Sequence, residues 1–255
     1  MLNRDGVELF YAEAGSGEPP VLLVHGWTCD HTAMAPLFTY FRRSHRVITV
    51  DLRGHGESDK PEQGYTMALF ADDLAWMCGQ LGVEKPIVIG HSMGGVIAVE
   101  LAARYPDIPS AVVTLDSPIV PPKELIDRLA PVLAGFQTPA FRELQSQFID
   151  SMFLPTDNQE RKERIKAGMI STPEHVAVSA VSNIFADTAS AAQACKVPLL
   201  VLAAAESLSD LPRLRALCPH VVTGQTVGAG HFHQLEVPEQ INVMIERFLS
   251  VALLQ

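Results

Sequence analysis

The sequence predicts an α/β fold, with a mostly parallel central sheet flanked by helices and an all-helical insertion. Short apolar runs alternate with amphipathic segments near both ends of the chain, which is typical of buried parallel strands and their crossover helices. Between residues 119 and 194 this alternation gives way to helix-like segments separated by prolines. A Gly-x-Ser-x-Gly motif over residues 90–94 lies between a strand-like run and a helix-like run.

Composition favours a globular protein that acts on a small molecule. The chain has 255 residues, of which 47% are hydrophobic and 19% charged, enough for a sizeable core in one α/β domain with an insertion. The formal net charge of −10 argues against nucleic acid or an anionic membrane as a partner. No metal-ligand spacing is present, so we expect no cofactor and no metal. The oligomeric state cannot be read from the sequence.

The cysteines and the N-terminus predict a cytoplasmic location. The four cysteines are scattered and form no C-x-x-C pair, so they are expected to be reduced and largely in the core: Cys29, Cys78, Cys195 and Cys218. Charged residues precede the first apolar run, which predicts no signal peptide. No apolar stretch approaches the ~20 residues of a membrane span.

In the first part of the chain, residues 21–24 (Val-Leu-Leu-Val) form the clearest strand, because a continuous apolar run is buried on both faces of a sheet. Residues 66–81 are amphipathic, with Asp72 and Asp73 in the early turns, and predict a helix. Similar patterns predict an early antiparallel strand over 7–12, strands over 46–51 and 86–89, and helices over 34–41 and 96–104.

In the second part, a buried strand over 111–115 precedes the insertion. The insertion contains four helix-like segments, over 123–136, 139–153, 158–169 and 173–185. Alternation resumes with a strand over 197–203, a helix over 208–218, a strand that starts at 220, and a closing helix over 237–249. We therefore expect a core formed by residues 1–118 and 195–255, and a helical cap formed by residues 119–194.

Ser92 is the candidate nucleophile. A serine between a strand and a helix lies on a sharp turn, which needs small residues at Gly90 and Gly94 because the two backbones come close together. We expect Ser92 to adopt a conformation near the left-handed αL region, with the helix N-terminus behind it. The free N–H groups and dipole there favour a developing negative charge.

The serine needs a base, and His231 is the candidate. It follows a strand late in the chain, in a glycine-rich loop that lets it turn inwards. His233 is the main alternative. His91 is next to Ser92 in sequence, but an elbow directs adjacent side chains apart. A carboxylate between the serine and the histidine in chain order would orient the base.

Two loops that follow strands have predicted roles. Gly26 lets the backbone approach a ligand, so the N–H of Trp27 could bind an oxyanion together with the N–H of Met93, while the Trp27 indole packs over the sheet edge. In the glycine-rich turn over 51–59, Asp51 and Arg53 are expected to hold loops together by hydrogen bonds, and His55 to be structural.

These motifs together resemble the α/β-hydrolase family, in particular its capped members, which include non-haem haloperoxidases, lactonases, esterases and meta-cleavage C–C hydrolases. The resemblance covers nearly the whole chain and is carried by residues 25–27, 51–58, 90–95 and 230–232. It implies the α/β-hydrolase fold, and the insertion at 119–194 falls where the family carries its helical cap.

The chain departs from the family pattern at the acid. The family usually carries an aspartate just beyond the strand that matches 198–203, but here that position is Ser207 and Glu206 is one residue away. Certain haloalkane dehalogenases and zearalenone-type lactonases carry the acid after the preceding strand, which corresponds to Asp116. We prefer Asp116, keep Glu206 as the alternative acid, and expect Asp210 to cap the next helix.

The resemblance implies a serine hydrolase that cleaves a carboxylic ester or lactone of a small apolar or aromatic substrate through an acyl-enzyme. Perhydrolysis and C–C bond hydrolysis use the same triad and stay open. A cofactor-free dioxygenase of this fold is a further alternative, because residues 26–31 resemble its start, but such enzymes favour histidines where this chain has Met93 and Cys29. A non-enzymatic binding module is the least favoured alternative.

Overall fold

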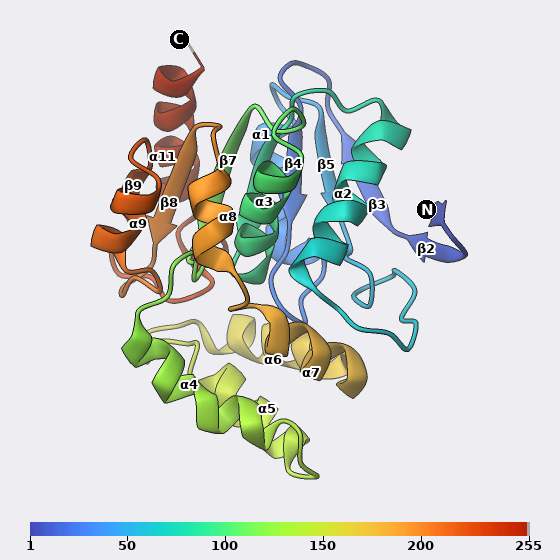
Figure 1. Ribbon diagram of the computed structural model, residues 1–255, viewed down its shortest axis with the longest axis vertical. Helices are drawn as coiled ribbons and strands as arrows, with labels where there is room; N and C mark the ends of the chain where they lie inside the picture. Colours follow the sequence, from blue (N-terminus) through green and yellow to red (C-terminus); the bar gives the residue numbers. More distant parts are fainter. Residues whose placement is uncertain (254–255) are drawn as a thin grey trace.

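A seven-stranded sheet forms the centre of the molecule (Figure 1), in the computed structural model, which describes residues 1–253. The strand order is β3-β5-β4-β6-β7-β8-β9; β3 runs antiparallel to β5 and every other neighbouring pair is parallel. The strands are β3 (Tyr11–Ala14), β4 (Val21–Val24), β5 (Val47–Val50), β6 (Ile87–His91), β7 (Ala111–Leu115), β8 (Leu199–Ala203) and β9 (Val222–Gln225). This arrangement confirms the predicted fold class.

The predicted strand over 7–12 is wrong as a single strand. Residues 7–9 form β2 (Val7–Leu9), which pairs with β1 (Leu2–Arg4) in a separate two-stranded sheet, whereas Tyr11 begins β3. Phe10 lies between them, where its N–H donates to Ser58 Oγ at 2.8 Å and its carbonyl accepts from the N–H of Asp51 at 3.1 Å. These contacts with the turn after β5 divide the strand, and the local sequence does not show them.

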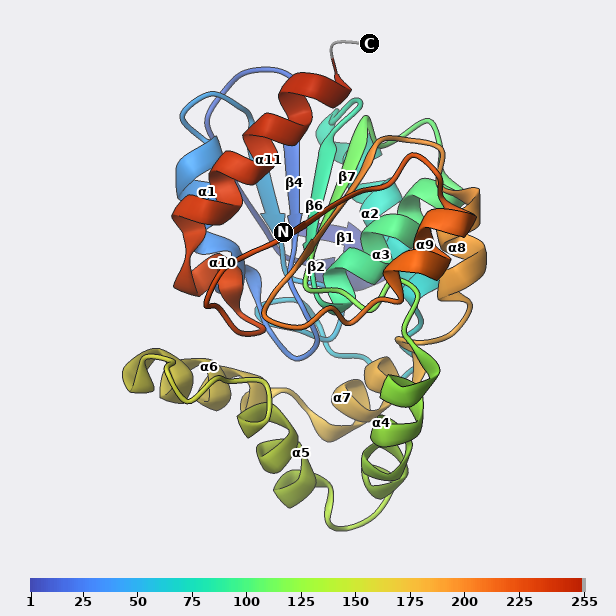
Figure 2. The same ribbon diagram turned by 90° about the vertical axis from the view of Figure 1, so that its left-hand side faces the viewer.

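Helices cover both faces of the sheet (Figure 2). One face carries α1 (Ala35–Phe41), which follows the 3₁₀ helix η1 (His31–Met34), together with α10 (His233–Glu236) and α11 (Pro238–Ala252). The other face carries α2 (Met67–Leu81), α3 (Met93–Arg104), α8 (Thr188–Ala194) and α9 (Leu211–Leu217). Along β4, Val21 and Leu23 pack into one core cluster and Leu22 and Val24 into the other, which explains the continuous apolar run.

The insertion forms four helices at one end of the sheet, α4 (Lys123–Gly135), α5 (Phe141–Asp150), α6 (Gln159–Ser171) and α7 (Glu174–Asn183). The figures show them as a separate layer beyond the carboxyl ends of the strands (Figures 1 and 2). The four predicted helical segments are thus confirmed. The sequence did not indicate α8, which packs against α3, and the predicted cap boundary at residue 194 stays a prediction.

Within residues 1–253, no helix has both the length and the apolar character that a membrane crossing requires. All four cysteines are buried and unpaired. Burial raises the pKa of the Cys29 thiol to about 12, so this thiol, two residues after Trp27, stays protonated at neutral pH.

Candidate active site

Ser92 occupies a strained turn between β6 and α3. Its backbone has φ 53° and ψ −119°. The positive φ agrees with the predicted αL geometry, but the ψ does not: these angles are those of the first central residue of a type II′ turn. The amide of Ser92 donates to Leu115 O at 2.8 Å, which ties the elbow to the end of β7. The side chain is half-buried at the start of α3.

The elbow requires its glycines because the backbones touch. A Cβ built on Gly90 would lie 2.2 Å from Gly94 O, and one built on Gly94 would lie 2.3 Å from Val24 O. Backbone atoms in a packed sheet cannot move aside for such a contact. The two glycines therefore let α3 start directly against β4 and β6, which brings Ser92 to the edge of the sheet.

His231 and Asp116 are brought together from positions 115 residues apart. His231 Nδ1 lies 2.7 Å from Asp116 Oδ2, and the two side chains are 13% and 5% exposed. The other oxygen of Asp116 accepts from the N–H of Ala204 at 3.0 Å. Asp116 follows β7 with φ 44°, a conformation that turns its side chain across the end of the sheet. A carboxylate in this position fixes the ring orientation and favours the Nδ1–H tautomer.

The alternative residues lie elsewhere. Glu206 is exposed and makes no hydrogen bond to His231 within the described part of the chain. Asp210 caps α9, as predicted, by accepting from the N–H of Arg213 at 3.0 Å. His233 is buried with its Nδ1 3.1 Å from Thr226 Oγ1, and burial lowers its pKa to about 4.

The loop after β4 lies directly against the elbow. A Cβ on Gly26 would be 3.2 Å from the Cβ of Ser92. Over residues 1–253, the backbone N–H groups of Trp27 and Met93 donate to no protein acceptor. The Trp27 indole is buried and its Nε1 donates to Ala177 O in α7 at 2.8 Å. The ring of Trp27 thus packs under the cap while its amide stays free of protein acceptors across the described residues, and the oxyanion role of this amide stays a prediction.

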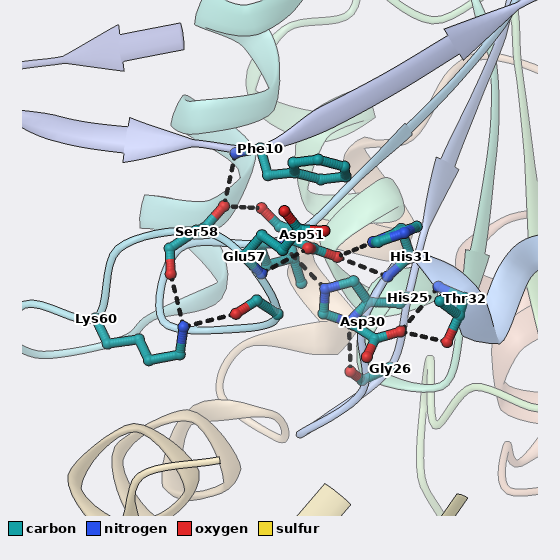
Figure 3. A network of polar contacts seen from close by, with 12 residues as sticks. Phe10, His25, Gly26, Asp30, His31, Thr32, Asp51, Glu57, Ser58 and Lys60 are labelled. Atoms are coloured by element: carbon teal, nitrogen blue, oxygen red, sulfur yellow. Dashed lines mark hydrogen bonds and ion pairs between the residues drawn. The ribbon is translucent and has the colours of Figure 1, made fainter. Parts of the chain in front are cut away.

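Asp51 is the centre of a network that supports this loop (Figure 3). Its Oδ1 accepts from the backbone N–H of His31 at 2.6 Å and from the ring Nδ1 of His31 at 2.9 Å. Its Oδ2 accepts from the N–H of Glu57 at 2.8 Å. The carboxylate thereby joins the turn after β5 to the segment that follows Trp27. The prediction that Asp51 holds loops together is confirmed.

His25 belongs to the same network and was not predicted. Its Nε2 accepts from the N–H of Leu52 at 3.0 Å, and its Nδ1–H donates to Gly26 O at 2.8 Å. Burial lowers the pKa of His25 and keeps its ring neutral. Only a neutral ring has one nitrogen that accepts and one that donates, as these two hydrogen bonds require. His25 therefore fixes the Gly26 peptide next to Ser92. The His-Gly-Trp motif gave the position of the loop but not this role.

Arg53 and His55 are structural, as predicted. Arg53 forms two hydrogen bonds to Asp73 in α2, at 2.8 Å from Nε and 2.7 Å from Nη2, and Arg4 also reaches Asp73 at 2.7 Å. The ring of His55 is buried with its Nδ1–H donating to Arg53 O at 3.0 Å. Burial lowers the pKa of His55 to about 3, which keeps it neutral.

His91 holds the backbone of the candidate base in place. It is 1% exposed, and its Nε2–H donates to the backbone carbonyl of His231 at 2.9 Å, with the two ring centroids 4.8 Å apart. Burial lowers the pKa of His91 well below its usual value, so no second positive charge competes with a protonated His231. No sequence pattern links residues 91 and 231, because their contact depends on the sheet order.

Curated relatives are similar over about half of their length. The chain is 40% identical over 132 residues to the 2-(acetamidomethylene)succinate hydrolase of Mesorhizobium japonicum, a match that covers 51% of this chain and 47% of that protein. It is 34% identical over 143 residues to the bifunctional esterase/perhydrolase DCH of Acinetobacter calcoaceticus, which covers 51% and 52% of the two chains.

Solved structures match over nearly the whole chain. A thermophilic esterase from Thermogutta terrifontis, solved with malate bound, has a TM-score of 0.83 at 28% identity and covers 96% of this chain and 94% of its own. An N-acyl homoserine lactone degrading enzyme has a TM-score of 0.84 at 26% identity and covers 96% and 98%. Residues 19–238 match the α/β hydrolase fold family, a span that includes the elbow, the cap helices and the His231 loop; the chain therefore belongs to the α/β-hydrolase fold family.

Proposed function

We propose that this protein is a serine hydrolase that cleaves a carboxylic ester or lactone of a small apolar or aromatic substrate. The observation that carries the proposal is the 2.7 Å contact between His231 Nδ1 and Asp116 Oδ2 at the sheet edge that also bears Ser92 on its positive-φ elbow. A hydroxyl on such a turn, with an imidazole that a carboxylate orients at the same edge of the sheet, is the arrangement that nucleophilic acyl transfer needs. The names of the esterase and lactone-degrading relatives support the same class of substrate.

In the first half-reaction, Ser92 Oγ attacks the substrate carbonyl carbon while His231 Nε2 takes the hydroxyl proton. Asp116 stabilises the resulting imidazolium through its 2.7 Å contact. The N–H groups of Trp27 and Met93 bind the oxyanion, which is the role that a pair of unpaired amides beside the nucleophile can perform. His231 then returns the proton to the leaving alcohol, the C–O bond breaks, and the acyl group remains on Ser92.

In the second half-reaction, water attacks the acyl carbon and gives its proton to His231. The tetrahedral intermediate collapses, the bond to Ser92 Oγ breaks, and His231 returns the proton to the serine. The products are the carboxylic acid and the regenerated enzyme. A lactone gives a single hydroxy acid, because its acyl and alcohol parts are one molecule.

The aromatic side chains around the site favour an apolar substrate. The Trp27 ring stacks with Phe136 of the cap at a centroid distance of 5.9 Å. Phe232 follows the candidate base and stacks with Phe153 of the cap at a centroid distance of 5.3 Å. Aromatic pairs thus join the cap to the core at the loops of Trp27 and His231, and such apolar surroundings favour a substrate with uncharged alkyl or aryl groups.

The proposal is tested with a panel of p-nitrophenyl esters of short to medium acyl chains and aryl lactones. Ser92→Ala is expected to abolish the burst of p-nitrophenol and steady turnover, because no acyl-enzyme can form. Glu206→Gln is the matched control, since it removes an exposed carboxylate from the next loop. Folded wild-type protein that turns over no ester or lactone would contradict the proposal.

Perhydrolysis is a second candidate function. It is favoured by the similarity to the relative named as a bifunctional esterase/perhydrolase. Hydrogen peroxide would replace water as the attacking group and give a peracid from the same acyl-enzyme. Adding hydrogen peroxide to the ester assay and measuring peracid separates the two outcomes. Peracid formation that depends on Ser92 would add this activity, whereas its absence would leave hydrolysis alone.

A further inference from the structure

Two carboxyl groups enclose the residue that precedes the candidate base. Gly230 is so closely packed that an added Cβ would lie 3.2 Å from Leu154 Cγ, 3.3 Å from Glu236 Oε1 and 3.4 Å from Asp157 Oδ2. Its N–H donates to Glu236 Oε1 at 3.1 Å. Glu236 ends α10 on the core side, whereas Leu154 and Asp157 belong to the cap loop between α5 and α6. The loop that carries His231 is thus held between core and cap.

The cap side of this contact is itself rigid. Asp157 Oδ2 accepts from the N–H of Leu154 at 2.7 Å, and its own N–H donates to Leu154 O at 3.1 Å. The same cap segment reaches the base directly, because the N–H of His231 donates to Met152 O at 3.4 Å. A displacement of residues 152–157 would therefore also displace the backbone of Gly230 and His231.

The two carboxyl groups are buried close together, which favours one proton shared between them. The carboxyl groups of Glu236 and Asp157 both lie within 3.4 Å of the position of a Cβ on Gly230, and their side chains are only 8% and 2% exposed. Two carboxylates cannot hydrogen-bond to each other unless one carries a proton. Among residues 1–253, Arg161 of α6 is the positively charged residue that faces both, at 3.4 Å from Asp157 and 4.0 Å from Glu236.

Burial and the hydrogen bond to Asp157, which both favour the neutral form, raise the pKa of Glu236 to about 7, while Gly230 N–H and Arg161 act in the opposite direction. A raised pKa means that the folded protein holds this proton more tightly than the unfolded chain does. Its contribution to stability is complete below the unfolded pKa of glutamate, ~4.3, and is lost as the pH rises through about 7. Above that pH, two negative charges would face a single arginine.

We propose that Asp157 and Glu236 form a proton-linked latch that ties the cap loop to the loop of His231 and holds the base in position. With one shared proton, the pair joins core to cap and Glu236 keeps Gly230 in place. Without it, the carboxylates repel each other and the cap loop separates from Glu236. This inference rests on the proposed function only in that His231 is the base; the contact between cap and core does not depend on the reaction. Both carboxylates act through His231 and are positioning residues.

The latch predicts an alkaline limb in the dependence of the rate on pH. Activity falls about tenfold per pH unit above the pKa of the latch if only the latched form turns over. Glu236→Gln keeps an acceptor for Gly230 N–H and a permanent donor for Asp157, so its alkaline limb should disappear. Asp157→Asn should behave in the same way and serves if Glu236→Gln does not fold. The exposed Glu239, three residues along, provides the matched control Glu239→Gln.

A measurement without substrate separates this proposal from the catalytic one. Hydrogen–deuterium exchange of residues 151–158 and 228–232, corrected for intrinsic rates, is compared at about pH 6 and about pH 8.5, on either side of the latch pKa. Wild type and Glu239→Gln should lose protection at the higher pH, and Glu236→Gln and Asp157→Asn should keep it. Equal loss in wild type and both latch variants, or an unchanged alkaline limb in both, would overturn the latch. The expected exchange pattern with no turnover of any ester would refute the proposed function alone.

Discussion

Replacing Asp116 with asparagine tests the candidate triad most directly, because both carboxylate oxygens are in use. One accepts from His231 Nδ1 at 2.7 Å and the other from the N–H of Ala204 at 3.0 Å. Asparagine supplies one oxygen and one NH₂ group at the same positions. With its oxygen on Ala204 N–H, its NH₂ faces Nδ1 and favours the tautomer with the proton on Nε2. That nitrogen can then no longer accept a proton from Ser92.

The size of the loss follows from the two orientations of the amide. A triad locked in the wrong tautomer loses on the order of 10⁴ in kcat, which corresponds to ~5.4 kcal/mol. The reversed amide restores the tautomer but sets NH₂ against Ala204 N–H, leaving buried groups unpaired at a cost of ~1–3 kcal/mol. The reversed form also presents a neutral oxygen to the imidazolium. We therefore expect Asp116→Asn to lower kcat by between about 10² and 10⁴.

The assay is the initial rate of p-nitrophenyl ester hydrolysis under saturating substrate, with Glu206→Gln measured in parallel. Thermal unfolding of both variants shows whether any loss of rate is a loss of folded protein. Glu206→Gln should retain wild-type kcat, because its carboxylate is exposed and lies outside the His231 contact. A kcat of Asp116→Asn within tenfold of the wild-type value, together with a large decrease in the kcat of Glu206→Gln, would refute the assignment of Asp116 and make Glu206 the acid.

Three further substitutions test the packing around the site, each by chemical denaturation. Gly94→Ala places a Cβ 2.3 Å from Val24 O and should lower the free energy of unfolding by at least ~2 kcal/mol; a neutral effect would contradict the close contact. Trp27→Phe removes the hydrogen bond to Ala177 O and should cost ~1 kcal/mol; no change would mean that water replaces it. Asp51→Asn leaves one of the two acceptor positions of the carboxylate unfilled and should lower the free energy of unfolding by ~2–3 kcal/mol. A decrease below ~0.5 kcal/mol would contradict the role of Asp51 in holding the two loops together.

The parts of the fold that the sequence predicts are those with local causes. The run over 21–24 is apolar at every position because both faces of β4 are covered, and this requires no knowledge of its neighbours. Gly90 and Gly94 mark the elbow because only glycine tolerates the backbone contacts there. The helix over 66–81 begins where predicted, since the side chain of Thr66 caps it.

The parts that it does not predict depend on contacts between distant segments. The break at Phe10 follows from Ser58 and Asp51, some 40 residues later in the chain. The ψ of Ser92 depends on how the end of β6 meets the start of α3, and the motif alone fixes only the need for a sharp turn. The resemblance to α/β-hydrolases restricts the candidate acid to Asp116 and Glu206. The contact that favours Asp116 depends on the strand order β7-β8-β9 and on the path of the loop that carries His231.

The cap contacts both candidate catalytic loops through backbone carbonyls. Ala177 O accepts from the Trp27 indole and Met152 O accepts from the amide of His231. Carbonyl acceptors are present whatever the side chain, so these two contacts restrict the path of the cap backbone and do not depend on the side chains of Ala177 and Met152. Under the proposed function, substrate preference can then vary through a partly exposed cap side chain such as Phe153, which stacks with Phe232. It follows that Phe153→Leu should change KM across the ester panel more than it changes kcat.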